Sequence, residues 1–273
     1  MKIHLLSIDP QNDFCQKQGA LYVPGAEEDI KRLTNFVNKM KNKIDDIHVT
    51  LDSHLPLHIA HPEMWLDKNN NHPPPFTLIT SDDVEKGIWR TRHPLIIDTA
   101  DGKMPYALYY TRALENNSRY ALCIWPPHCL IGSWGACVDD TFHQSLGNWQ
   151  IDRFKAVNYV TKGSNFRTEH YSAVKADVED PVDPSTQLNM TLIDILQDPE
   201  IKDILITGQA LSHCVANTIR DIADNFGEEN IKKFVLLEDT SSNVPGFENE
   251  GQLFIRELSD RGMRITTTRD YAA

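Results

Sequence analysis

Short apolar runs alternate with amphipathic stretches along most of this 273-residue chain. The alternation constrains the fold strongly, because a strand that returns to the same sheet through a helix runs parallel to its predecessor. The runs expected to form strands are residues 3–9, 46–52, 120–125, 156–162, 203–208 and 233–239, with 264–268 as a further edge strand. We therefore expect a three-layer α/β fold, in which helices cover both faces of a mostly parallel sheet of about six strands.

The stretches between these runs have helical patterns. In residues 26–43, apolar side chains such as Ile30 and Leu33 recur at helical spacing. The other expected helices cover residues 136–147, 188–198, 212–226 and 248–262. Residues 55–118 break the alternation, and their centre, WLDKNNNHPPPFT, is too rich in turn residues for a long helix. We expect a single domain over residues 1–273 that carries this excursion with short elements of its own.

The composition excludes several classes of partner. A formal net charge of −12 disfavours nucleic acids and anionic membranes, so we expect neither as a partner. The sequence contains no run of about 18 apolar residues that could span a bilayer, and it lacks a signal-peptide pattern. The five cysteines are odd in number and include no CxxC pair, which disfavours a disulfide framework. These features indicate reduced thiols and a cytoplasmic location.

Polar and reactive side chains follow most of the expected strands. In open parallel sheets, ligands bind beyond the carboxyl ends of the strands. The residues at these ends are Asp9, Asp52 with His54, His128 in the segment WPPHC, Lys162, Cys214 and Asp239. A charged residue at one strand end is common. An acid, a cation and a thiol at the same edge are a more specific indication of a functional site.

Cys214 is the candidate nucleophile. It follows Ser212, which we expect to cap a helix. The positive end of a helix and a nearby lysine would both favour the thiolate. Asp9, Lys162 and Cys214 could then act as acid and base, cation and nucleophile. The alternative is that Cys214 is a small buried apolar side chain, and residue chemistry alone leaves both open. We expect His213 to have a structural role or to support residues that contact a ligand, because adjacent helical residues point in different directions.

Asp52 and His54 form a second constellation. Residues two apart in an extended segment point the same way, so a carboxylate and an imidazole could share a metal ion. His128, in a rigid WPPH turn, is the best-placed third ligand. The other candidates are His58, His61 and His72. Two histidines and one carboxylate with open positions suit Zn²⁺, Fe²⁺ or Mn²⁺. The alternative is a set of scattered surface histidines.

Six segments carry a pattern known from one enzyme family. They are SIDPQNDFC (7–15), LDSHLPLH (51–58), WPPHCLIGSWGA (125–136), VTKGSNFRTEHYSAV (160–174), TGQALSHCVANT (207–218) and LLEDTSSNVPGF (236–247). In this order they resemble the nicotinamidase branch of the isochorismatase-like cysteine hydrolases. Each segment alone is weakly specific, but the ordered set is highly specific. Residues 55–118 are longer than the corresponding part of the family usually is.

The resemblance implies a metal-containing cysteine amidohydrolase. The side chains that it assigns are the catalytic Asp9, Lys162 and Cys214, the metal ligands Asp52, His54 and His128, and the substrate-binding Phe14, Trp125 and Tyr171. It also implies a cis peptide bond between Gln209 and Ala210, and an oxyanion hole formed by the amides of Ala210 and Cys214. Zn²⁺ is the first choice of metal, with Fe²⁺ or Mn²⁺ as alternatives.

The reaction that the resemblance implies is hydrolysis of nicotinamide to nicotinate and ammonia through a thioester on Cys214. A hydrolase of the same fold that acts on another amide or carbamoyl substrate is one alternative. A non-enzymatic, flavodoxin-like binding module is an alternative of another class, although the chain has no GxGxxG or GxxxxGK[ST] loop for phosphate groups. The resemblance also implies a homo-oligomer with a small-molecule amide substrate.

Overall fold

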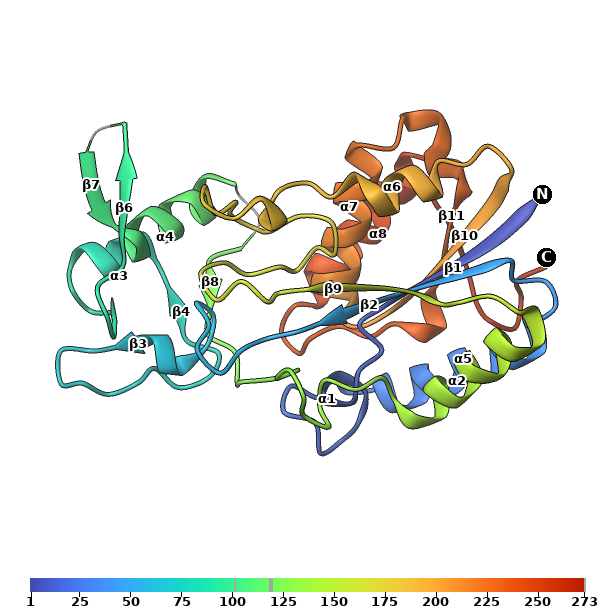
Figure 1. Cartoon of the computed structure of the whole chain (residues 1–273), viewed down its shortest axis with the longest axis horizontal. Helices are drawn as coiled ribbons and strands as arrows, with labels where there is room; N and C mark the ends of the chain where they lie inside the picture. Colours follow the sequence, from blue (N-terminus) through green and yellow to red (C-terminus); the bar gives the residue numbers. More distant parts are fainter. Residues whose placement is uncertain (101, 118–119, 273) are drawn as a thin grey trace.

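The centre of the fold is a parallel sheet of six strands (Figure 1). It is seen in a computed structural model that describes residues 1–100, 102–117 and 120–272. The strands are β1 (Lys2–Ile8), β2 (Asp46–Asp52), β9 (Asn158–Lys162), β10 (Ile201–Gly208), β11 (Phe234–Leu237) and β12 (Arg264–Thr266). Their order is β12-β11-β10-β1-β2-β9, and every neighbouring pair is parallel. The expected sheet and its additional edge strand are confirmed.

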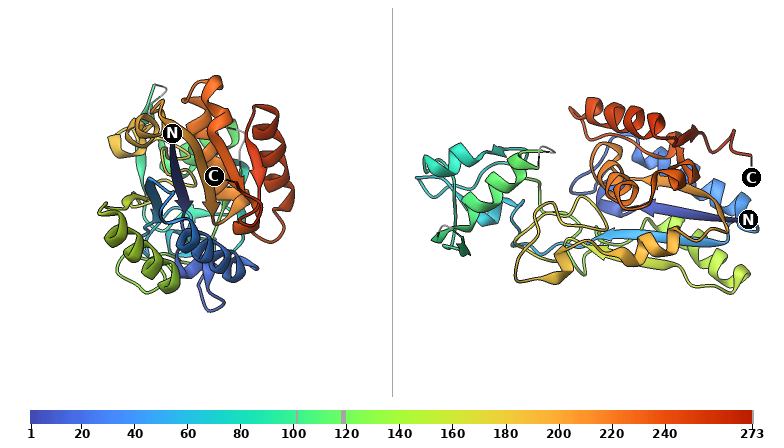
Figure 2. Two further views of the ribbon diagram at one scale, coloured as in Figure 1. Left: turned by 90° about the vertical axis from the view of Figure 1, so that its right-hand side faces the viewer. Right: turned by 90° about the horizontal axis from the view of Figure 1, so that it is seen from above.

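Helices cover both faces of this sheet, as Figures 1 and 2 show. The helices on one face are α2 (Ala26–Met40) and α5 (Asp140–Arg153), and those on the other are α6 (Met190–Leu196), α7 (Ala216–Asp224) and α8 (Glu248–Asp260). In α2, Ile30, Leu33 and Val37 recur at helical spacing and are buried, which explains how this helix packs. The three-layer architecture is therefore confirmed. No helix in the described ranges is both long and apolar enough to cross a membrane.

The strand expected at residues 120–125 does not join the central sheet. Within that range the structure has only β8 (Leu122–Cys123), which pairs antiparallel with β4 (Leu78–Ile79) in a separate small sheet. Trp125 is followed by two prolines, which have no N–H to donate to a strand ladder. The prediction that this run lies beside the other strands is therefore wrong.

The excursion at residues 55–118 projects beyond the end of the sheet at which β2 ends (Figure 1). Besides β4, its elements are η1 (Pro62–Met64), β3 (Trp65–Leu66), α3 (Ser81–Glu85), β5 (Arg90–Thr91), β6 (Ile96–Thr99), β7 (Gly102–Pro105) and α4 (Tyr106–Asn116). Trp65, Tyr106 and Tyr110 are fully buried and belong to the same apolar cluster as the central core. The expected short elements are confirmed, while residues 101 and 118 lie outside the described residues. The single domain over residues 1–273 stays a prediction.

Two helices differ from their expected positions. The helix predicted over residues 136–147 begins at Asp140, because the Asp139 carboxylate accepts hydrogen bonds from the N–H groups of Thr141 and Phe142 and caps it there. The helix predicted over residues 212–226 opens with a π-helical turn, η3 (Leu211–Val215), and continues as α7. The π-helical turn contains Cys214, so it sets the backbone conformation at the candidate nucleophile. The remaining helices lie close to their expected ranges.

Candidate active site

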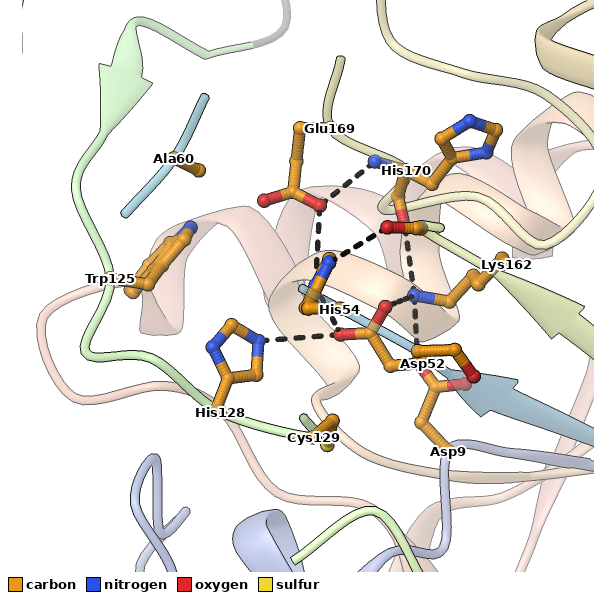
Figure 3. A network of polar contacts seen from close by, with 12 residues as sticks. Asp9, Asp52, His54, Ala60, Trp125, His128, Cys129, Lys162, Glu169 and His170 are labelled. Atoms are coloured by element: carbon orange, nitrogen blue, oxygen red, sulfur yellow. Dashed lines mark hydrogen bonds and ion pairs between the residues drawn. The ribbon is translucent and has the colours of Figure 1, made fainter. Parts of the chain in front are cut away.

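Three adjacent strands bring Asp9, Asp52 and Lys162 together at their carboxyl ends (Figure 3). Lys162 Nζ lies 3.0 Å from Asp9 Oδ2 and 3.1 Å from Asp52 Oδ1, and it donates a hydrogen bond of 2.7 Å to the carbonyl oxygen of His170. All three ionisable side chains are buried. Asp9 has a positive φ of 47°, a strained conformation for a non-glycine residue. One buried ammonium group thus stands between two buried carboxylates.

Cys214 completes this group from the segment that follows β10. Its Sγ lies 3.6 Å from Lys162 Nζ. The peptide bond between Gln209 and Ala210 is cis, as expected. The prediction that Ser212 caps the helix is wrong, because the π-helical turn begins one residue before it. Ser212 lies inside that turn, and its Oγ accepts a hydrogen bond from the N–H of Val244.

Burial controls the charge of the thiol. It raises the pKa of Cys214 well above its ordinary value; Lys162 acts to lower this pKa, and the Asp9 carboxylate acts to raise it. Desolvation therefore outweighs the nearby charge that favours the thiolate. Burial also raises the pKa of Asp9, against the effect of Lys162. A neutral thiol and a carboxyl group that binds protons readily share one ammonium neighbour, which suits proton exchange between them.

Asp52, His54 and His128 offer three ligand atoms next to this group (Figure 3). His54 Nε2 lies 3.0 Å from Asp52 Oδ2, and His128 Nε2 lies 3.3 Å from the same oxygen. The Nδ1 atoms of the two rings face carbonyl oxygens, of Gly163 at 3.0 Å and of Pro126 at 2.8 Å. We assign the ring protons to Nδ1 on this basis, which leaves both Nε2 lone pairs free for a metal ion.

The three donors fit a divalent cation. His54 Nε2 is buried, and it lies within 4 Å of two carboxylates, those of Asp52 and Glu169. Burial lowers the pKa of His54, but the Asp52 carboxylate outweighs burial and raises this pKa to about 9. The Asp52 carboxylate therefore favours a cation at Nε2, and a metal ion bound there would replace the second ring proton. Gly163 leaves room for the ligands, since a Cβ at its φ of +84° would lie 2.8 Å from Asp52 Oδ1 and from His54 Cε1.

The other predicted ligand candidates lie outside the three-ligand group. His58 Nε2 lies 3.1 Å from the carbonyl oxygen of Thr168, and its Nδ1 accepts a hydrogen bond from the N–H of Ala60. Both nitrogens of His58 are thus used. His72 is exposed, and its Nδ1 faces backbone carbonyl oxygens. His61 is buried but does not join the three-ligand group.

One pocket connects the thiol with the three-ligand group. Asp52 and His128 line it, together with Ala210 and Cys214. The aromatic residues predicted for this pocket, Phe14, Trp125 and Tyr171, also line it. The Trp125 indole N–H donates a hydrogen bond of 3.0 Å to the Tyr171 hydroxyl, which fixes two of the walls. The structure thus gathers every side chain that the resemblance assigned, whereas Asp239 binds Thr268 away from this pocket.

Sequence reasoning missed other residues of this pocket. Glu169 lines it, and a carboxylate two residues before an expected pocket tyrosine was the signal available. His213 also lines it; burial lowers the pKa of this imidazole to about 3, so the ring is neutral. The missed apolar lining residues are Leu21, Val23 and Val244. These carry no such signal, because they look like ordinary core residues.

The structure has a buried thiol, lysine and carboxylate beside a possible three-ligand metal group on a parallel α/β sheet, which is the arrangement that the resemblance to isochorismatase-like cysteine hydrolases implies. No family model matches the chain. Its sequence is similar to two nicotinamidases. It is 25% identical over 236 residues to the nicotinamidase of Saccharomyces cerevisiae, with 86% of each chain covered. It is 24% identical over 218 residues to that of Escherichia coli, with 80% of this chain and 74% of the relative covered.

Solved structures share the fold over nearly the whole chain. The yeast nicotinamidase Pnc1p bound to the inhibitor nicotinaldehyde superimposes with a TM-score of 0.65 at 18% identity, covering 97% of this chain and 99% of its own. The pyrazinamidase of Pyrococcus horikoshii in complex with zinc gives a TM-score of 0.55 at 19% identity, with 98% and 99% covered. The solved structures confirm the α/β fold, and the two similar nicotinamidase sequences support the resemblance to the nicotinamidase branch.

Proposed function

We propose that this protein hydrolyses nicotinamide to nicotinate and ammonia. The observation that carries the proposal is the single pocket in which Cys214, beside Lys162, shares aromatic walls with a three-ligand metal group. The two similar curated nicotinamidases support this substrate. A flat heteroaromatic amide would place its ring between Phe14 and Trp125 and its carboxamide at the thiol.

The reaction uses one proton acceptor twice. Asp9 takes the proton of Cys214 while Sγ attacks the carboxamide carbon, and Lys162 stabilises the negative charge on either group. Asp9 then gives this proton to the departing ammonia, which leaves a thioester on Sγ. A water molecule that loses a proton to Asp9 attacks the thioester carbonyl carbon. Nicotinate leaves, and the proton returns to the Cys214 sulfur.

The backbone around the cis peptide bond is proposed to hold the oxyanion of each tetrahedral intermediate. Ala210 lines the pocket, and its N–H donates to no other group within the described residues. We assign this N–H and that of Cys214 to the oxyanion. Loss of one such donor typically costs about 2.7–4 kcal/mol of transition-state stabilisation.

Asp52, His54 and His128 are proposed to hold Zn²⁺, and the same donors would also suit Fe²⁺ or Mn²⁺. The similar pyrazinamidase with bound zinc supports this choice. When bound, the ion supplies a Lewis-acid position that orients the pyridine ring. The cytoplasmic location and the homo-oligomeric state stay predictions.

Substrate preference tests the proposed function. We expect purified, zinc-loaded protein to release ammonia from nicotinamide and pyrazinamide faster than from an aliphatic amide, because the aromatic walls and the metal group recognise a ring nitrogen. The measurement is initial rates of ammonia release for each compound. A preference for an aliphatic amide or a carbamoyl compound would favour the alternative substrate class. Absence of ammonia from every compound would favour the binding module.

Replacement of His54 by alanine is expected to weaken zinc binding and to raise KM for nicotinamide. Loss of a metal ligand should exceed the about 10–100-fold loss of metal affinity that follows removal of an outer-shell partner. Competition with a chromogenic chelator measures the zinc affinity. His93→Ala, at an exposed histidine, is the matched control and should bind zinc like the wild type. Unchanged zinc affinity in His54→Ala would remove this residue from the ligand set.

A further inference from the structure

Asp29, on helix α2, is a buried carboxylate that the reaction above does not use. The residue is only 3% exposed. Its Oδ2 accepts a hydrogen bond of 2.9 Å from Gln209 Nε2 and one of 2.6 Å from the hydroxyl of Ser242. Its Oδ1 accepts a hydrogen bond of 2.7 Å from Arg32 Nη2. A carboxylate that is removed from water needs such donors, and two of them come from residues far away in the sequence.

Gln209 is held at both ends of its side-chain amide. Nε2 donates to Asp29, and Oε1 accepts a hydrogen bond of 3.2 Å from the N–H of Ser242. This assignment of nitrogen and oxygen follows from the partners, because a carboxylate accepts and a backbone N–H donates. The backbone N–H of Gln209 donates a hydrogen bond of 2.9 Å to the carbonyl oxygen of Ile8 in β1. Side chain and backbone of this residue are therefore both fixed.

Ser242 connects the same carboxylate to the other side of Ala210. Its carbonyl oxygen accepts a hydrogen bond of 2.8 Å from the N–H of Leu211. Its hydroxyl and its N–H reach Asp29 and Gln209, as described above. The residues before and after Ala210 are thus tied to one group of side chains.

Ala210 has one backbone group that is held and one that is open. Its carbonyl oxygen accepts hydrogen bonds of 3.1 Å from the N–H groups of His213 and Val215, whereas its own N–H donates to no group of the described residues. Ala210 lines the pocket together with Cys214. The N–H belongs to the planar peptide unit that joins Gln209 to Ala210, so its direction depends on how Gln209 is held.

We propose that Asp29 is a positioning residue for the oxyanion of the reaction. Through Gln209 and Ser242 it directs the Ala210 N–H at the oxygen that becomes negative in each tetrahedral intermediate. A donor stabilises a transition state best when it is oriented before the reaction begins. Loss of the Asp29 contacts leaves the donor in place but lets its peptide unit turn away. The inference rests on the proposed function, since the oxyanion forms only when the thiol attacks an amide.

Two substitutions remove the contacts at opposite ends. Asp29→Asn removes the charge and one acceptor oxygen, and Gln209→Leu removes both amide contacts. Each should lower kcat for nicotinamide about tenfold or more, but less than the about 10²–10³-fold effect of deleting a donor, and should leave KM and zinc content unchanged. Initial rates of ammonia release measure both constants. Glu28→Gln, at an exposed glutamate of the same helix, is the matched control and should keep the wild-type kcat.

An aldehyde gives a readout that a purely structural role would not change. The Cys214 thiol adds to the carbonyl group of nicotinaldehyde: the sulfur bonds to the carbon, and the thiol proton passes to the oxygen. The tetrahedral adduct places this oxygen at the proposed donors. In both variants the inhibition constant of nicotinaldehyde should rise by the factor by which kcat/KM falls. Nicotinate forms no such bond, so its affinity should not change.

Exchange of the two groups provides a rescue. Gln209→Glu alone places a second carboxylate beside that of Asp29 and should also lower kcat, because like charges repel. In the double variant Asp29→Asn with Gln209→Glu, an amide again faces a carboxylate, with donor and acceptor exchanged. This protein should recover most of the lost kcat and of the nicotinaldehyde affinity.

Other outcomes would overturn the proposal. Unchanged kcat and nicotinaldehyde inhibition in Asp29→Asn and Gln209→Leu would mean that Asp29 only stabilises the fold, even if the unfolding temperature falls. Equal weakening of nicotinate and nicotinaldehyde would mean that it shapes the pocket. If both variants fail to fold, Ser242→Ala, which removes a single hydrogen bond to Asp29, carries the same comparison. Failure of the proposed function is a separate result, because wild-type protein would then release no ammonia from nicotinamide.

Discussion

Replacement of Cys214 by alanine is expected to lower the rate of ammonia release from nicotinamide by about 10⁴-fold or more, the scale at which loss of a nucleophile acts. The substitution removes the sulfur that lies 3.6 Å from Lys162 Nζ, and with it the bond to the substrate carbon. Lys162 keeps its contacts with Asp9 and Asp52, and the three-ligand group is untouched. Zinc content and the thermal unfolding temperature should therefore match the wild type.

The control for this experiment is Cys137→Ala, which removes an exposed thiol and should keep the wild-type rate. Mass spectrometry after rapid acid quenching adds a second measurement. The wild type should carry an acyl group on the peptide that contains Cys214, and the Cys214→Ala protein should carry none. Ammonia release by Cys214→Ala at the wild-type rate would exclude the thiol as the nucleophile.

The part of the site that lies at strand ends could be predicted from the sequence. Parallel strands present their carboxyl ends at one edge, so Asp9, Asp52 and Lys162 had to meet once β1, β2 and β9 were neighbours. The spacing of Asp52 and His54 likewise predicted a shared ligand position. Cys214 was found at the correct edge because it follows β10 closely.

Other features of the site and the fold depend on tertiary packing and desolvation, which local sequence patterns do not contain. Glu169 comes from a largely irregular stretch between β9 and α6, whose path follows from tertiary packing rather than from periodicity. The short strand before Trp125 was misplaced, since a run of apolar residues does not say which sheet it joins. The neighbours that favour the thiolate of Cys214 can be inferred from the sequence, whereas the desolvation that outweighs them appears only in the folded structure.

Replacement of Lys162 by methionine is expected to lower both stability and activity. The ammonium group is buried at 3.0 Å and 3.1 Å from Asp9 and Asp52, and breaking a buried ion pair typically costs about 3–5 kcal/mol. Burial and the Asp52 charge already raise the pKa of Asp9, and loss of the lysine raises it further. Asp9 then holds a proton that it must release to act as the base. Denaturant unfolding and ammonia release measure the two losses, and Lys39→Met, at an exposed lysine, is the control.

The loss of stability in Lys162→Met is expected to grow as pH rises. A carboxyl group whose pKa is raised by folding binds more protons in the folded than in the unfolded state, so the free energy of unfolding falls as pH rises from the ordinary Asp value of 3.8 toward the raised value. Lys162→Met should therefore lose stability relative to the wild type as pH increases through this window. Addition of Asp9→Asn removes one of the two unpaired carboxylates, so the double variant should regain stability but remain inactive. Equal stability of Lys162→Met and the wild type at acidic and neutral pH would mean that the ammonium group does not stabilise the two buried carboxylates.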